Sequence, residues 1–185
     1  YQSPDALNLI YQTINMNYKR VIGLNLYAPF GVGYIWNATA TANVFNQREK
    51  ADKFHDISFD NSKWIFYGEL SNSFKFSQNC PVSLSFDFSY ISPSLQGIAD
   101  LSSMWKVDAG IKWQFGKKRC CELDLKADDI FNTWSPTMTI NHAYQDYGMK
   151  VRDMTRNFKL TFIWHFNGFK PKDNAIDTSR FGTGK

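Results

Sequence analysis

The sequence contains no long hydrophobic run and few cysteines. Nowhere among its 185 residues do about 18 apolar residues follow one another, so no transmembrane helix is expected. The three cysteines, Cys80, Cys120 and Cys121, are an odd number and form no Cys-x-x-Cys pair. This excludes a disulfide framework and argues against a structural zinc site. Adjacent strand residues point to opposite faces, and we therefore expect Cys120 and Cys121 to be poorly placed to bond each other.

Signatures of catalysis and of nucleic-acid binding are missing as well. The sequence has no GxSxG, HExxH or P-loop motif, and GVGYIW at 31–36 lacks the third glycine of a dinucleotide-binding loop. The net charge is +4, but the basic residues are scattered and form no stripe for a nucleic acid. We therefore predict a protein that is not an enzyme, has no nucleic-acid partner and holds neither a cofactor nor a metal ion.

Isolated histidine and acidic residues offer no better site. His55 is near Asp52 and Asp56 in the sequence, but a solvated loop explains it more simply than a metal ion does. Adjacent carboxylates on a strand point apart, which is poor geometry for shared acid–base chemistry. We therefore assign Asp129, which follows Asp128, a structural role where a strand passes into a loop.

Alternation of apolar and polar residues is the main positive feature of the sequence. In VSLSFDFSY, residues 82–90, every second side chain is apolar, which predicts a strand with one apolar and one polar face. Similar segments occupy residues 22–30, 34–44, 63–76, 105–115, 121–128 and 158–166, with a weaker one at 7–16. The pattern predicts an all-β chain, an antiparallel up-and-down meander of about eight strands. Such a meander would form a barrel or a segment of a larger transmembrane β-barrel.

The predicted connections alternate in length along the chain. Short links are expected at 31–33, 77–81 and 116–118, and long loops at 47–60, 92–103 and 132–156. In an up-and-down meander, this order places all short links at one rim and all long loops at the other. Bacterial outer-membrane barrels have the same asymmetry, with short periplasmic turns and long extracellular loops.

Aromatic residues recur at the two ends of several apolar faces. Eight residues of a tilted strand rise about 20 Å, close to the roughly 25 Å apolar band between two aromatic girdles of a membrane barrel. Pairs with this spacing are Trp105 and Trp113, Phe66 and Phe74, and Phe158 and Phe166. Alternation by itself does not distinguish lipid from a protein core. The alternative is a soluble, lipocalin-like barrel that surrounds a small apolar ligand.

Several segments resemble one family of proteins. PSLQG at 93–97, LSSMWKVDAGIKWQFGKK at 101–118 and LDLKADDIFNTW at 123–134 resemble, in order and spacing, the end of Bacteroidetes outer-membrane β-barrel proteins related to TonB-dependent receptors. NFKLTFIWHF at 157–166 resembles the closing strand of that family, and IDTSRFG at 176–182 resembles its tail. The resemblance implies a bacterial outer-membrane transporter for nutrient uptake, with a plug and a barrel of about twenty-two strands. This chain looks like its C-terminal part.

The expected organisation and partners follow from this resemblance. We expect residues 1–167 to form the β-barrel segment and residues 168–185 to form a polar C-terminal tail. The expected partners are outer-membrane lipid and an external nutrient ligand. Strand edges left free would also favour self-association of the chain.

The longest predicted loop, 132–156, is where a receptor of this type would meet its ligand, since binding residues concentrate in loops. The alternative is that this loop merely extends a hairpin beyond the membrane. The candidate ligand contacts in it are Trp134, Tyr144, Tyr147, Lys150 and Arg152.

Overall fold

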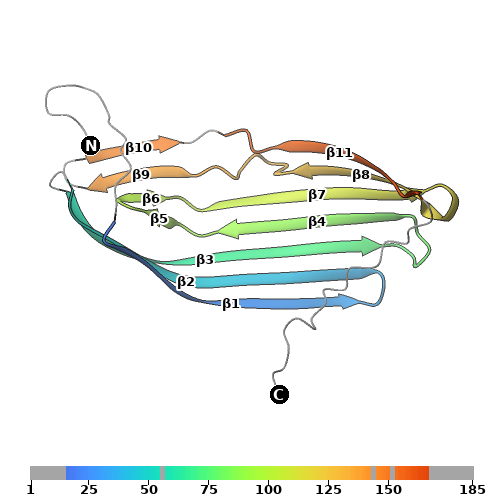
Figure 1. Ribbon diagram of the computed structural model, residues 1–185, viewed down its shortest axis with the longest axis horizontal. Coiled ribbons are helices and arrows are strands. Elements are labelled where there is room, and N and C mark those ends of the chain that lie inside the picture. The colour runs from blue at the N-terminus through green and yellow to red at the C-terminus, as the bar shows by residue number, and fades with distance from the viewer. Residues whose placement is uncertain (1–15, 55–56, 143–144, 151–152, 167–185) are drawn as a thin grey trace, which may run out of the picture.

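The computed structural model describes residues 16–54, 57–142, 145–150 and 153–166, and most of them are in β-strands. Two antiparallel sheets form, with the orders β1-β2-β3-β4-β7-β8-β11 and β10-β9-β6-β5 (Figure 1). The strands of the larger sheet are β1 (Tyr18–Val32), β2 (Trp36–Phe54), β3 (Ile57–Lys75), β4 (Val82–Ile91), β7 (Met104–Phe115), β8 (Cys121–Asp128) and β11 (Asn157–Trp164). Those of the smaller sheet are β5 (Ser94–Gln96), β6 (Ala99–Leu101), β9 (Thr137–His142) and β10 (Gln145–Lys150).

The predicted all-β antiparallel meander is confirmed. Each strand of the larger sheet pairs antiparallel with its neighbours, and seven strands make up the sheet. The weak candidate strand at 7–16 lies outside the described residues except for Met16. No helix in the described part of the chain is long or apolar enough to cross a membrane.

The predicted sorting of the connections is confirmed, but the three long segments are not loops. The short turns lie at one end of the larger sheet, and the smaller sheet lies at the other (Figure 1). Residues 47–60 mostly continue β2 and β3, whereas 92–103 contain β5 and β6, and 132–156 contain β9 and β10. The expectation that these segments are loops was wrong. They form strands, but they do not place an apolar residue at every second position on the face that is apolar elsewhere in the sheet.

One face of the larger sheet is apolar and uncovered. The register sets Leu70 opposite Ala40 on one side and Phe88 on the other, so apolar residues form continuous rows across the strands. Trp105 and Trp113, the pair spaced to a bilayer, are 39% and 46% exposed on this face. No described element packs over it. A sheet whose large apolar side chains point away from the protein requires an apolar solvent on that side.

The opposite face is polar and internally paired. Its ion pairs are Lys106–Asp108 at 2.6 Å, Lys112–Glu122 at 3.0 Å and Lys159–Asp128 at 2.7 Å. Toward the short turns this face is hollowed, with a volume of about 430 Å³ lined mainly by serine, lysine, glutamine and acidic side chains. Within the described residues, every buried side-chain nitrogen and oxygen has a hydrogen-bond partner. The polar face is therefore suited to contact with water.

The apolar side chains change face near the end of the sheet that carries the second sheet. We call residues 45–54 and 57–65, together with β5, β6, β9 and β10, the crown, and the rest of the larger sheet the span. In the crown, Phe59 and Ile65 lie on the continuation of the polar face and are buried, Ile65 to 2% exposure. Ala51 and Ala99 are buried there as well. The crown therefore has a small protein core, whereas the span has none.

Candidate functional site

A buried carboxylate holds the β5–β6 hairpin against the crown. Glu49 is 1% exposed, and its Oε1 accepts hydrogen bonds from Gln47 Nε2 at 2.7 Å and pairs with Lys19 Nζ at 2.9 Å. Its Oε2 accepts a hydrogen bond from the backbone N–H of Gly97 at 2.6 Å. Such charge-assisted bonds are shorter and stronger than neutral ones. Glu49 thus ties β1, β2 and the turn between β5 and β6 together.

Further contacts fix the same hairpin from β2 and β3. Gln47 Nε2 donates to the Leu95 carbonyl at 3.0 Å, and Asn61 Nδ2 donates to the Gly97 carbonyl at 3.1 Å. Lys63 and Asp100 form an ion pair at 2.5 Å. Gly97 has φ of +63°, a conformation that glycine adopts without strain. The PSLQG segment, which contains β5 and the start of the following turn, is therefore docked on the polar side of the sheet.

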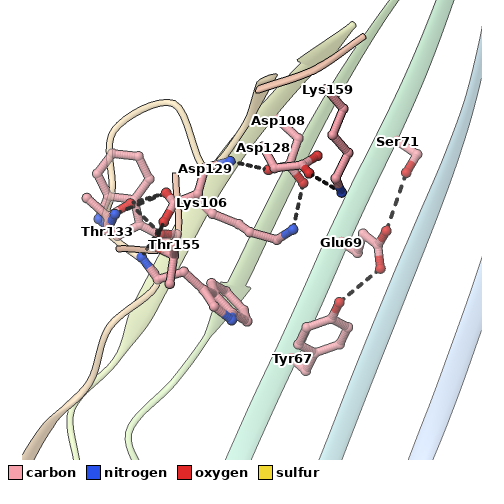
Figure 2. A network of polar contacts seen from close by, with 12 residues as sticks. Tyr67, Glu69, Ser71, Lys106, Asp108, Asp128, Asp129, Thr133, Thr155 and Lys159 are labelled. Atoms are coloured by element: carbon pink, nitrogen blue, oxygen red, sulfur yellow. Dashed lines mark hydrogen bonds and ion pairs between the residues drawn. The ribbon is translucent and has the colours of Figure 1, made fainter. Parts of the chain in front are cut away.

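Asp129 is the centre of a second cluster, where β8 ends. It has φ of +45° and is 2% exposed. Its carboxylate accepts hydrogen bonds from the backbone N–H groups of Thr133 and Trp134, each at 3.0 Å, and from the Thr155 hydroxyl. Its own N–H donates to Asp108 Oδ1 at 2.6 Å. Figure 2 shows the carboxylate enclosed by these donors, which agrees with the structural role expected for it.

Charged side chains continue from this cluster along the polar face. Lys106 lies between Asp108, its ion-pair partner, and the ring of Trp134, whose centroid is 5.8 Å from Nζ. In Figure 2, Lys159 reaches Asp128 beside the Lys106–Asp108 pair. Cation–π contact and ion pairing hold the Lys106 ammonium group in one position. The cluster presents paired charges to water beside an aromatic ring.

The charged side chains of this cluster are already paired with other groups of the protein. The Asp129 carboxylate accepts hydrogen bonds from backbone N–H groups and a hydroxyl. The Asp108 carboxylate accepts hydrogen bonds from Lys106 and from a backbone N–H. In the part of the chain that the structure describes, no group of three or more histidine, cysteine or acidic side chains is placed to hold a metal ion. What the cluster offers is a fixed cation, fixed carboxylates and an indole ring.

The outer side of the crown carries an exposed ion pair. Arg48 contacts Asp60 at 2.6 and 2.7 Å through two parallel hydrogen bonds. The hydrogen bond from Arg48 lowers the pKa of the Asp60 carboxyl, and the same bond raises the pKa of the Arg48 guanidinium. Next to this pair, Asn46 Nδ2 donates to Ser62 Oγ at 3.0 Å. Apart from Trp64, which is exposed on the same side, the face that is apolar in the span is therefore polar in the crown.

The structure brings only part of the predicted site together. Trp134 belongs to the Asp129 cluster, whereas Tyr147 and Lys150 lie on β10, opposite Ile140 and Thr137 of β9. Tyr144 and Arg152 lie outside the described residues. The predicted contacts therefore do not form one described cluster around Trp134.

The hydrogen bonds that Glu49 makes to the β5–β6 hairpin were not predicted from the sequence. Residues 47–60 were expected to be a loop, in which polar residues need no special explanation. The available signal was the order Gln47, Glu49, Ala51, which are all on one side of a strand that continues beyond Val44. A strand face with two polar residues and a small apolar one indicates a partner that packs on it.

The larger sheet has an uncovered apolar face, about nine residues long along each strand, and a charged opposite face. Its short and long connections lie at opposite ends. These are the features of the wall of a transmembrane β-barrel. The chain belongs to the outer membrane protein beta-barrel family, whose model matches residues 1–164. No curated protein and no solved structure is significantly similar to it. The protein is thus a bacterial outer-membrane barrel protein. The family match argues against the soluble lipocalin-like alternative, and Phe86, Phe88, Trp105 and Trp113 are exposed on the uncovered apolar face.

Proposed function

We propose that the protein is the C-terminal barrel portion of a TonB-dependent-receptor-like transporter of a Bacteroidetes bacterium, and that it takes up a nutrient without catalysis. The observation that carries this proposal is the crown, a folded hairpin layer fixed by Glu49 over the polar face at one rim only. A structured layer at one mouth of a wet passage can select what enters. The TonB-dependent receptor class rests on the sequence segments that resemble it.

The two edge strands support a barrel larger than the described sheet. β1 and β11 each pair on one side only within the described residues. In lipid, each unsatisfied backbone group costs several kcal/mol, so spanning sheets close on themselves. We propose that strands of the same protein complete the barrel. Pairing between copies of the chain is the other way to satisfy these edges.

The ligand would meet the polar face of the span and the adjoining crown. Trp134 and Lys106 supply an aromatic surface beside a cation, and Tyr147 and Lys150 supply further contacts on β10. Stacking and hydrogen bonding of this kind suit a polar, hydroxyl-rich or charged nutrient better than an apolar one. Tyr144 and Arg152 remain candidates of the same kind from the sequence.

Uptake by the source bacterium tests this proposal. A strain with the gene deleted would be supplied with radiolabelled oligosaccharides, oligopeptides and iron chelates, with and without an uncoupler of the inner membrane. We expect uptake of one class to be lost on deletion and to stop when the membrane is uncoupled. Uptake that remains at the parental rate for all three classes, or that is indifferent to the uncoupler, contradicts the proposal.

A pair of point variants sharpens the same experiment. Trp134→Ala should lower uptake of the identified nutrient, because the ring lies on the polar face beside Lys106. Phe131→Ala is the matched control, since Phe131 is exposed and packs on Trp105, on the apolar side of the sheet. Equal uptake by the two variants would show that Trp134 does not contact the nutrient.

A further inference from the structure

The turn between β7 and β8 brings two adjacent thiols together. Both cysteines are free, in agreement with the expectation that they are poorly placed to bond each other, although their sulfur atoms lie close together. Gly116 and Lys118 have φ of +84° and +57°, and the chain curls through a short 3-10 turn, η1 (Lys117–Arg119). Cys120 then adopts helical angles, φ −73° and ψ −11°, before β8 begins at Cys121. Alternation of side chains holds only for extended residues, so it does not separate this pair. The two sulfur atoms are 3.7 Å apart.

Gly116 leaves the space that the two sulfur atoms occupy. A methyl group on Gly116 would lie 3.0 Å from Cys120 Sγ and 3.6 Å from Cys121 Sγ. Because φ is +84° there, a side chain would also strain the backbone. Both cysteines are only partly covered by the protein. The turn thus leaves room for two thiols at the short-turn rim of the sheet.

The geometry favours chelation over a disulfide. Adjacent Cα atoms across a trans peptide are about 3.8 Å apart, shorter than the roughly 4.4–6.8 Å of ordinary disulfides, so a bond between these residues would be strained. Two thiolates that bind one tetrahedral zinc-type ion at about 2.3 Å each stand roughly 3.8 Å apart. The observed separation of 3.7 Å is close to the distance in the second arrangement.

We infer that Cys120 and Cys121 form a two-thiolate site for a thiophilic divalent cation of the zinc type, at the short-turn rim of the barrel. Each thiol loses its proton when it binds, and water fills the remaining coordination positions. With two protein ligands instead of the four of a structural site, the cation exchanges readily. The site lies apart from the crown and does not depend on the proposed uptake of a nutrient.

Cadmium titration of the reduced chain in detergent micelles tests this inference, because thiolate-to-cadmium charge transfer gives an ultraviolet absorption band. We expect the band to saturate at one equivalent of cadmium per chain. Cys120→Ser and Cys121→Ser should each bind cadmium more than about tenfold more weakly, since each retains a single thiolate. Cys80→Ser is the matched control and should bind as the parent does, because Cys80 lines the hollow of the polar face, which neither Cys120 nor Cys121 lines.

Gly116→Ala keeps both thiols and tests the geometry. Its methyl group would displace Cys120 Sγ, and we expect weaker cadmium binding with the same number of titratable thiols. Circular dichroism of every variant checks that the strands are retained. The inference is overturned if the reduced parent gives no band, if either cysteine variant keeps it at full strength, or if Cys80→Ser loses it. Isolation of the parent with Cys120 and Cys121 already joined as a disulfide overturns it as well.

Discussion

The span and the crown share the strands β2 and β3, yet the apolar side chains of the two regions lie on opposite faces. In β3, Phe66 is exposed on the apolar face of the span, whereas Ile65, the preceding residue, is buried on the other face in the crown. In β2, the alanines and Val44 on the apolar face give way to Asn46 and Arg48 on the same side. The strands β2 and β3 therefore extend from the part of the sheet that contacts lipid into the crown.

This difference shows how the two regions are stabilised. The crown excludes water from a small core and closes it with hydrogen bonds to Glu49, as a soluble domain does. The span has no core, and its apolar side chains gain their favourable transfer free energy from lipid. Its polar face is held by ion pairs such as Lys112–Glu122.

Removal of the Glu49 carboxylate should open the crown and leave the span intact. Glu49→Leu leaves the buried donors Gln47 Nε2 and Gly97 N–H without this acceptor, which should cost about 2–5 kcal/mol. Limited proteolysis should then cut the β5–β6 hairpin. Lys50→Met is the control, because Lys50 and its partner Asp52, at 3.4 Å, are both exposed and such an ion pair contributes little. A Glu49→Leu crown that resists the protease would show that Glu49 does not hold the hairpin.

Arginine on the two faces of β3 should have unequal effects. Leu70 lies in the middle of the apolar face, where Leu70→Arg should destabilise the span by about 2–4 kcal/mol in lipid vesicles. Ser71→Arg, one residue further along and on the polar face, should cost less than about 1 kcal/mol. Urea unfolding in vesicles measures both. Equal costs would mean that the two faces contact the same solvent.

Asp129 should matter more than the adjacent Asp128 at the boundary between the two regions. Asp129→Asn replaces one accepting oxygen with an amide that faces the donors of Thr133 and Trp134, at a cost of about 1.5–3 kcal/mol. Asp128→Asn is the control, since Asp128 pairs with the exposed Lys159. Urea unfolding compares them. If Asp128→Asn is the more damaging, the carboxylate of Asp129 is not the centre of this cluster.

The smallest effect is expected on the outer side of the crown. Arg48 holds the pKa of Asp60 below its ordinary value, so the pair stabilises the fold at neutral pH, and this contribution is lost as the pH falls through that lowered pKa. Asp60→Asn should therefore be slightly less stable than the parent at neutral pH and equal to it in acid. The difference should also shrink in high salt, since the pair is exposed. A difference that grows toward acid contradicts this assignment.

The sequence by itself determined the strands of the span and their two faces. The alternation in 82–90 and the spacing of Trp105 and Trp113 require only local backbone geometry, and both are confirmed by the exposed apolar face. The order of short and long connections likewise predicted which end of the sheet would carry the additional structure. Period two along a strand is a property of the extended backbone, so the sequence is enough to reveal it.

Only the tertiary structure decided what the long segments and the short turns do. Glu49 holds the β5–β6 hairpin because the backbone N–H of Gly97, far away in the sequence, lies 2.6 Å from Glu49 Oε2. No local pattern predicts that contact. Cys120 and Cys121 meet because a turn with left-handed residues replaces the extended geometry on which alternation depends. Local periodicity fixes which face a strand residue occupies, whereas contacts between distant residues and turn conformations depend on how the whole chain packs.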